Sequence, residues 1–220
     1  MTDIISTHYP SPAAKFADLV VHLAGLACAL LGSGILLGLA FGMGDLSRVA
    51  AVSIYEVGLI LMLSLSTAYN FAKVRWQPLL RRFDHAGIFI MIAASYTPFT
   101  TQNLTGWWSI GMTTAVWVVA GIGVLAKLLL PGLDKRFWVG LYLALGWLVL
   151  VAIKPMIDGL SWVALLLLAI GGLVYSTGTV FYLMRRLKFR RAIWHGHVIG
   201  GAGLHYAAVL VGVVLTGSHG

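Results

Sequence analysis

The sequence is dominated by a succession of seven long apolar stretches joined by short polar connections. The stretches cover approximately residues 17–41, 49–72, 83–102, 106–128, 136–154, 160–184 and 192–216. A helix needs about 20 predominantly apolar residues to cross the hydrocarbon core of a bilayer. Pro78, Pro131 and Pro155 fall in or beside the connections, where a helix is expected to stop. The pattern predicts an all-α membrane protein with one seven-helix transmembrane domain over 17–216, preceded by an N-terminal segment over 1–16.

The charge content of the chain excludes an ordinary soluble domain. Only 10% of the 220 residues are charged, whereas a soluble domain carries about 25%. The net charge of +8 does not indicate a nucleic-acid partner, because the cations lie in short connections between apolar stretches. They are better explained as topology determinants and contacts to anionic membrane lipids. The single cysteine, Cys28, excludes a disulfide framework and a thiolate metal cluster.

The distribution of lysine and arginine predicts the orientation. Of the 15 cations, 13 fall on one side of the predicted bundle. These are Lys15, Lys73, Arg75, Arg81, Arg82, Lys127, Lys135, Arg136, Arg185, Arg186, Lys188, Arg190 and Arg191. Only Arg48 and Lys154 fall on the other side. Because the positive side faces the cytoplasm, the N-terminus is predicted to be cytoplasmic and, with seven spans, the C-terminus to be outside.

Polar residues gather at the cytoplasmic ends of four predicted spans. Ionisable groups inside a bilayer are costly, so each is a candidate functional residue. They are Asp18 and His22 in the first span, Ser66 and Asn70 in the second, Asp84 and His85 in the third, and Arg191 and His195 in the seventh. Two interpretations stay open: a polar site shared by four helices, or side chains that cap helices and reach the wet interface.

A second, smaller polar layer lies toward the outer side. Glu56 is the only glutamate of the chain and His205 lies at a similar depth in the last span. They form a pair if their helices are neighbours. The alternative is a Glu56 that hydrogen-bonds to backbone or water.

Rows of small residues occur in the first and last spans. Gly34, Gly38 and Gly42 recur every four residues, as do Gly196 and Gly200. Such rows allow helix backbones to approach closely in a membrane. We expect packing within the bundle, with a homo-oligomer contact as the alternative.

The stretch from Ser66 to Phe99, STAYNFAKVRWQPLLRRFDHAGIFIMIAASYTPF, resembles the central signature of the hemolysin III family. This family is the bacterial branch of the superfamily of adiponectin and progestin membrane receptors. Further matching stretches are YLALGW at Tyr142–Trp147, GGLVYSTGTVFY at Gly171–Tyr182 and AIWHGHVIGGAGLHY at Ala192–Tyr206. The resemblance implies the same seven-helix topology, in a bacterial cytoplasmic membrane.

The resemblance also implies a cytoplasmic zinc site, which this sequence matches only in part. Ser66, Asp84 and His195 fit the family pattern, but Asn70 and Arg191 occupy the positions of two family histidines. An amide is a poor zinc ligand and a guanidinium stays positively charged. Of the ligands in the pattern, Asp84 and His195 remain, and they predict a weak zinc site. No tightly bound cofactor is expected. Arg191 is instead predicted to form an ion pair with Asp84.

Two classes of function follow from these residues. The first is a non-enzymatic membrane protein that binds lipid or regulates the membrane, with a channel or pore as a further alternative. The second is a zinc-dependent hydrolase of lipid amides, with Ser66 and Asp84 as the candidate catalytic residues. We favour the first class, because the ligands that would activate a metal-bound water are substituted. The sequence leaves the natural ligand, the oligomeric state and ion conduction open.

Overall fold

The computed structural model describes residues 8–130, 132–184 and 186–216, and this part of the chain is helical without a strand. Arg185, which was counted among the cytoplasmic cations, lies outside the described residues, as do residues 1–7 of the predicted N-terminal segment. The helices are α1 (Pro12–Gly42), α2 (Leu46–Phe71), η1 (Val74–Trp76), α3 (Gln77–Gln102), α4 (Gly106–Leu129), α5 (Lys135–Gly146), η2 (Leu148–Ala152), α6 (Ile153–Gly159), α7 (Trp162–Leu183), α8 (Arg190–Val209) and η3 (Leu210–Val214).

Short polar side chains fix where several helices begin. Ser11 accepts a hydrogen bond from the Ala14 backbone N–H at the start of α1, at 3.2 Å. Asp45 caps α2 and Asp134 caps α5 in the same way. Each cap satisfies a backbone donor that the first helical turn leaves without a partner. Gly44, just before the cap of α2, has a positive φ of 72°, a conformation that glycine adopts without strain.

Six helical segments are long and apolar enough to cross a membrane. They are α1, α2, α4, the segment Lys135–Gly159, α7 and the segment Arg190–Val214. The third helix, α3, has 26 residues but is more polar, since it carries Arg81, Arg82 and Asp84 near its start. The fold is thus that of a multi-pass membrane protein, in which α3 differs from the other long helices in composition.

The fifth predicted span, 136–154, is not one continuous helix. It divides into α5, the 3₁₀ turn η2 and α6, and extends to Gly159. Pro155 contributes to the break because it has no backbone N–H to donate to the preceding turn. Tyr96 of α3 lies at the break: its hydroxyl donates to the Gly146 carbonyl at 2.8 Å and accepts from the Val149 N–H at 2.8 Å. A side chain therefore satisfies backbone groups that the irregular segment frees.

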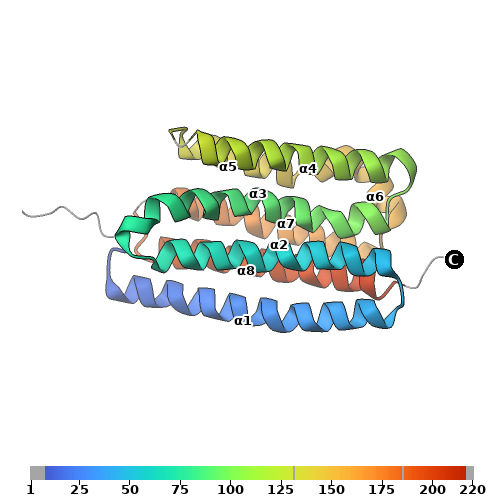
Figure 1. Ribbon diagram of the computed structural model, residues 1–220, viewed down its shortest axis with the longest axis horizontal. Coiled ribbons are helices and arrows are strands. Elements are labelled where there is room, and N and C mark those ends of the chain that lie inside the picture. Colours follow the sequence, from blue (N-terminus) through green and yellow to red (C-terminus); the bar gives the residue numbers. More distant parts are fainter. Residues whose placement is uncertain (1–7, 131, 185, 217–220) are drawn as a thin grey trace, which may run out of the picture.

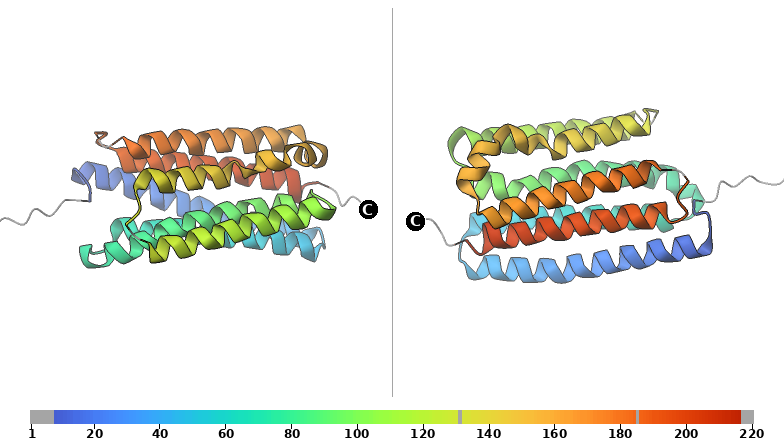
Figure 2. Two further views of the ribbon diagram at one scale, coloured as in Figure 1. Left: turned by 90° about the horizontal axis from the view of Figure 1, so that it is seen from above. Right: turned by 180° about the vertical axis from the view of Figure 1, so that it is seen from behind.

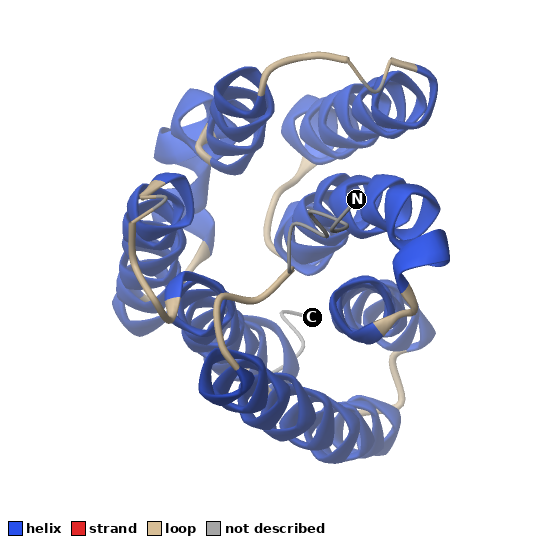
Figure 3. Ribbon diagram, turned by 90° about the vertical axis from the view of Figure 1, so that its left-hand side faces the viewer, coloured by secondary structure: helices blue, strands red, loops and turns tan. Residues whose placement is uncertain are grey.

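The helices form a bundle along one common direction (Figure 1). In this view α1 lies at the bottom, α2 and α8 above it, α3 and α7 next, and α4 and α5 at the top. The last helix returns to the first, since α8 packs against both α7 and α1. The two views of Figure 2 show the same bundle from above and from behind, with α5 and α6 bent at the break. Figure 3 looks along the bundle at the end where α1, α3, α5 and α8 begin.

The predicted packing role of the first glycine row is wrong. A Cβ atom added at Gly34, Gly38 or Gly42 meets no atom within 4 Å, because these residues lie on the outward face of α1. The close helix approaches occur elsewhere. A Cβ at Gly58 would come within 2.5 Å of the Ala94 Cβ, where α2 meets α3.

Candidate functional site

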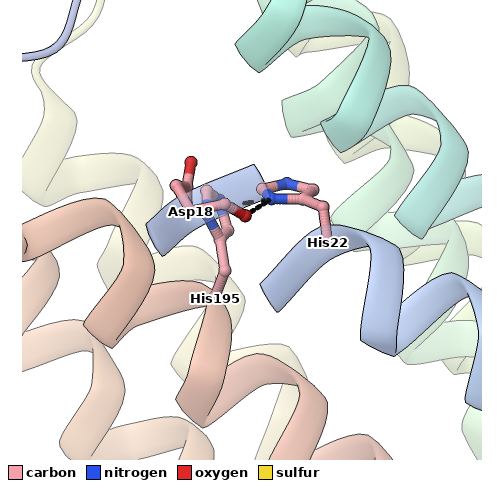
Figure 4. Close-up of side chains that lie close together, drawn as sticks. All are labelled: Asp18, His22 and His195. Carbon is pink, nitrogen blue, oxygen red and sulfur yellow. Dashed lines mark hydrogen bonds and ion pairs between the residues drawn. The ribbon is translucent and has the colours of Figure 1, made fainter. Parts of the chain in front are cut away.

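The candidate site is a group of polar side chains at the end of the bundle where α1, α3, α5 and α8 begin. We call it the inner polar cluster; it comprises His8, Tyr9, Asp18, His22, Ser66, Asn70, Arg191 and His195. Three helices and the segment before α1 supply these residues. Figure 4 shows its centre, where Asp18 and His22 from α1 face His195 from α8.

Asp18 is the hub of the cluster. Its side chain is fully buried, with 0% exposure. One carboxylate oxygen lies 2.6 Å from His195 Nδ1, and the other accepts a hydrogen bond from the Tyr9 hydroxyl. A buried carboxylate is stable only when its oxygens are paired in this way. The sequence placed Asp18 at this end of the bundle but did not indicate that it is the centre of the site.

His22 connects Asp18 to the second helix. Its Nδ1 lies 2.8 Å from the Asp18 backbone oxygen, and its Nε2 lies 3.3 Å from the Ser66 hydroxyl oxygen. A carbonyl oxygen can only accept, so this partner assigns the proton to Nδ1 and leaves Nε2 as the acceptor for Ser66. The His22 and His195 rings are 4.3 Å apart between centroids.

Arg191 has other partners than the predicted one. Its guanidinium donates to Asn70 Oδ1 at 2.9 Å and to the His8 backbone oxygen at 3.2 Å. Among the described residues, no ion pair of 4.0 Å or less joins Arg191 to Asp84. The predicted Asp84–Arg191 pair is therefore replaced by a pair with an amide, because Asn70 and the chain before α1 lie within reach of the guanidinium.

The segment before α1 closes one side of the cluster. His8 Nδ1 lies 3.2 Å from the Arg191 guanidinium and His8 Nε2 lies 3.1 Å from Asn70 Oδ1, which together describe a neutral imidazole. Burial and the positive charge of Arg191 lower the pKa of His8 below its usual value. Burial and the hydrogen bond to Asp18 raise the pKa of Tyr9. Nothing in the sequence of this segment indicated these contacts, because they depend on where the chain enters α1.

The zinc arrangement implied by the family pattern does not fit this structure. Arg191 and Asn70 hydrogen-bond to each other at the positions of two family histidines, so a permanent cation and an amide stand where ligands would be. A different group offers ligand atoms: those of Asp18, His22 and His195 lie within 4.8 Å of one another. Asp84, a predicted ligand, lies outside this group. The signal in the sequence was the spacing of Asp18 and His22, which places both on one helix face.

A cavity of about 490 Å³ adjoins the cluster. His22, Ser66 and His195 line its polar end, together with Asp84, and its walls come from α2, α3, α4, α5, α7 and α8. Much of the wall is apolar, including Met62, Ile88, Met91, Ile92, Val139, Leu143 and Ile199. The broken fifth span also contributes to the wall through Gly146 and Trp147. The cavity thus joins a polar end to an apolar interior.

One of the two interpretations of the outer layer, a pair between Glu56 and His205, is not realised: no ion pair within 4.0 Å joins these two residues. Glu56 accepts a hydrogen bond from Ser33 of α1, and His205 packs against Tyr175 with ring centroids 5.4 Å apart. His205 Nε2 is buried without a hydrogen-bond partner in the described part of the chain. Ser33 satisfies one carboxylate oxygen of Glu56, and the other, Oε1, is buried without a partner in the described part of the chain.

Comparison with known proteins identifies a family. Residues 15–206 match the family described as Haemolysin-III related. The chain belongs to this family. It is 31% identical over 205 residues to Hemolysin-3 of Bacillus cereus, which covers 93% of this chain and 94% of the relative. It is 30% identical over 200 residues to the Hemolysin-3 homolog of Bacillus subtilis (strain 168), covering 89% and 92%.

A more distant similarity extends to animal proteins. The chain is 29% identical over 204 residues to the human Monocyte to macrophage differentiation factor, covering 88% of this chain and 82% of the relative. The match to the family confirms the resemblance predicted from the segment Ser66–Phe99.

Proposed function

We propose that this haemolysin-III related protein is a non-enzymatic lipid-binding protein of the membrane, which holds an amphiphile in the central cavity. The observation that carries the proposal is the cavity itself, which is about 490 Å³ in volume and joins the inner polar cluster to an apolar interior. Sites for small molecules commonly measure about 300–1,000 Å³ and are mainly apolar with a few polar groups. A lipid, which has an apolar chain and a polar head, matches both parts.

The proposal includes the seven-span topology and the cytoplasmic-membrane location. The 26-residue α3 is long enough to cross a bilayer at 1.5 Å per residue. Its Asp84 lies against the protein interior, and several of its apolar residues are buried between α2 and α4. Its lower hydropathy is consistent with a span that is covered by other helices. With α3 as a span, the cation asymmetry supports a cytoplasmic N-terminus and an outside C-terminus.

Substitutions that fill the cavity test the proposal. Ser95 lines the cavity and Thr177 lies on the exposed face of α7. In nanodiscs, a photoreactive hexadecanol carrying a diazirine should label peptides of α3, α5 and α7. Ser95→Phe should reduce this labelling several-fold and Thr177→Phe should leave it unchanged. Labelling that is confined to outward faces, or equal in both variants, would contradict the proposal.

A metal-dependent hydrolase is the second candidate, and one observation favours it. Asp18, His22 and His195 bring a carboxylate and two imidazoles together beside the cavity. A metal bound there would supply an activated water for attack on a carbonyl. Zinc that copurifies at one ion per chain, and is lost in His22→Ala, would favour this candidate over the first.

A further inference from the structure

A second polar region of the cavity lies apart from the inner polar cluster, where α3, α4 and α5 meet. Lys127 of α4, Trp138 of α5 and His85 of α3 all line the cavity there. We call this region the α4–α5 rim. It carries several polar groups for which the described residues provide no hydrogen-bond partner.

Lys127 is a buried cation with no carboxylate at ion-pair distance in the described part of the chain, and Asp84 acts on it only from farther away. Its side chain is 5% exposed, and its ammonium group lies 4.2 Å from the centroid of the Trp138 ring. The described part of the chain provides it with no hydrogen bond and no ion pair within 4.0 Å. A buried charge is costly unless an opposite charge or hydrogen bonds compensate it, and a ring face does so only in part.

Trp138 adds a buried donor without an acceptor. The residue is 3% exposed, and its Nε1 atom is buried with no hydrogen-bond partner in the described part of the chain. An indole N–H can only donate, so only an acceptor can satisfy it. His85 Nδ1 is a third buried atom without a partner there. Three groups from three helices that line one cavity therefore lack hydrogen-bond partners among the described residues.

The charges that line the cavity show which kind of partner is missing. Arg81, Lys127, Lys135, Arg190 and Arg191 contribute positive charge, and Asp84 is the one acidic residue among the described lining residues. Asp84 Oδ2 lies 4.0 Å from His85 Nε2. A water molecule would satisfy the indole N–H but would add no negative charge beside Lys127. An oxyanion satisfies both.

We propose that the α4–α5 rim binds the anionic head group, a phosphate or a carboxylate, of a single-chain lipid whose chain extends into the apolar part of the cavity. Lys127 supplies the charge, and the Trp138 N–H supplies a directed hydrogen bond. His85 supplies a second polar contact. This inference rests on the proposed lipid-binding function and adds the chemical class of the ligand and the place of its head group. The same chemistry would bind free phosphate, so the experiment must separate the two sources.

The experiment measures displacement of the photoreactive hexadecanol in nanodiscs of neutral lipid. The competitors are dodecyl phosphate, laurate, dodecanol and dodecyltrimethylammonium, and inorganic phosphate is tested alone by its effect on thermal unfolding. The variants are Lys127→Met, which removes the charge, and Trp138→Phe, which removes only the N–H group and the second ring. Lys154→Met is the control, because Lys154 is exposed and does not line the cavity. It lies in α6, where it pairs with Asp158 of the same helix at 3.0 Å.

We expect dodecyl phosphate and laurate to bind more tightly than dodecanol, and dodecyltrimethylammonium to bind least. Lys127→Met should weaken the binding of dodecyl phosphate about 10-fold or more, and Trp138→Phe about 3-fold. Lys154→Met should have no effect. Trp138→Phe keeps the inference testable if Lys127→Met does not fold.

Three outcomes would overturn the inference. If all four amphiphiles bind alike in every variant, the cavity binds lipid but the rim does not select an anion. If inorganic phosphate stabilises the protein as strongly as dodecyl phosphate does, the ligand is a free anion and not a lipid. If the hexadecanol probe itself labels no cavity residue, the proposed function fails as well.

Discussion

Arg191 shows how a single residue changes the chemistry of the inner polar cluster. Its guanidinium bridges α2 and the segment before α1 through Asn70 and the His8 backbone. Removing it leaves these acceptors without their charged donor. We therefore expect Arg191→Ala to lower the free energy of unfolding by about 1–3 kcal/mol, measured by denaturation in detergent.

A double-mutant cycle identifies the partner of Arg191. The cycle with Asn70→Ala should show a coupling above about 0.5 kcal/mol, whereas the cycle with Asp84→Ala should be additive. The reverse result would restore the direct ion pair with Asp84 that the sequence suggested.

The same residue determines the expected metal content. A guanidinium beside the zinc position that the resemblance implies disfavours a divalent cation, and both oxygens of Asp18 are already paired with Tyr9 and His195. Purified protein should therefore retain well under one zinc per chain, measured by elemental analysis. The double substitution Asn70→His with Arg191→His should raise retention, and either substitution alone should raise it less. A full zinc ion in the native protein would refute this expectation.

His8 makes the contact of the N-terminal segment sensitive to pH. Burial and Arg191 lower its pKa below the usual 6.5, so the docked imidazole binds a proton less readily than an undocked one. The contact is therefore complete above pH 6.5 and weakens as the pH falls through the lowered pKa. His8→Gln, which does not titrate, should flatten the change in thermal stability between neutral and acidic pH. An equal pH dependence in both proteins would show that another group is responsible.

Among the helices, the broken fifth span depends on one side chain of α3. Tyr96 accepts from the Val149 N–H and donates to the Gly146 carbonyl. Tyr96→Phe leaves a partly buried N–H unsatisfied and should lower the free energy of unfolding by about 1–3 kcal/mol. Tyr206→Phe is the matched control, since its hydroxyl only donates to the Gly32 carbonyl, at 2.9 Å. A loss in Tyr206→Phe as large as in Tyr96→Phe would argue against a special role at the break.

The elements also show which features a sequence can predict. The ends of α2, α4 and α7 agree with the predicted stretches within a few residues, because polar caps, charges and prolines mark them locally. The break after Gly146 was not predicted. The apolar sequence continues through the break. The backbone carbonyl that the break frees at Gly146 accepts a hydrogen bond from the hydroxyl of Tyr96, which lies 50 residues earlier in the chain. Long-range satisfaction of backbone groups leaves no local pattern.

In the whole molecule, the depth of the polar residues was easier to predict than their partners. Asp18, His22, Ser66, Asn70, Arg191 and His195 do meet at one end of the bundle, as position along each span implied. Which of them touch depends on the rotation of each helix about its axis. That rotation brings Arg191 to Asn70 and Glu56 to Ser33, and it turns Gly34 of α1 outward. Rotation is set by packing over the whole bundle, which spacing within one helix does not reveal.

The orientation of the molecule can be tested together with the number of spans. The asymmetry of 13 cations against two favours a cytoplasmic N-terminus, and seven spans then place the C-terminus outside. If α3 did not cross, an even number of spans would return the C-terminus to the cytoplasm. A reporter that is active only outside the cytoplasm should therefore be active after Gly220 and after Asn103, and inactive after Lys73 and after Lys188. The fusion sites after Lys73 and Asn103 lie on either side of α3. Equal reporter activity at both sites would therefore show that α3 does not cross the membrane. Activity after Lys73 and Lys188 alone would show that the bundle has the opposite orientation in the membrane. The α4–α5 rim would then lie at the outer surface.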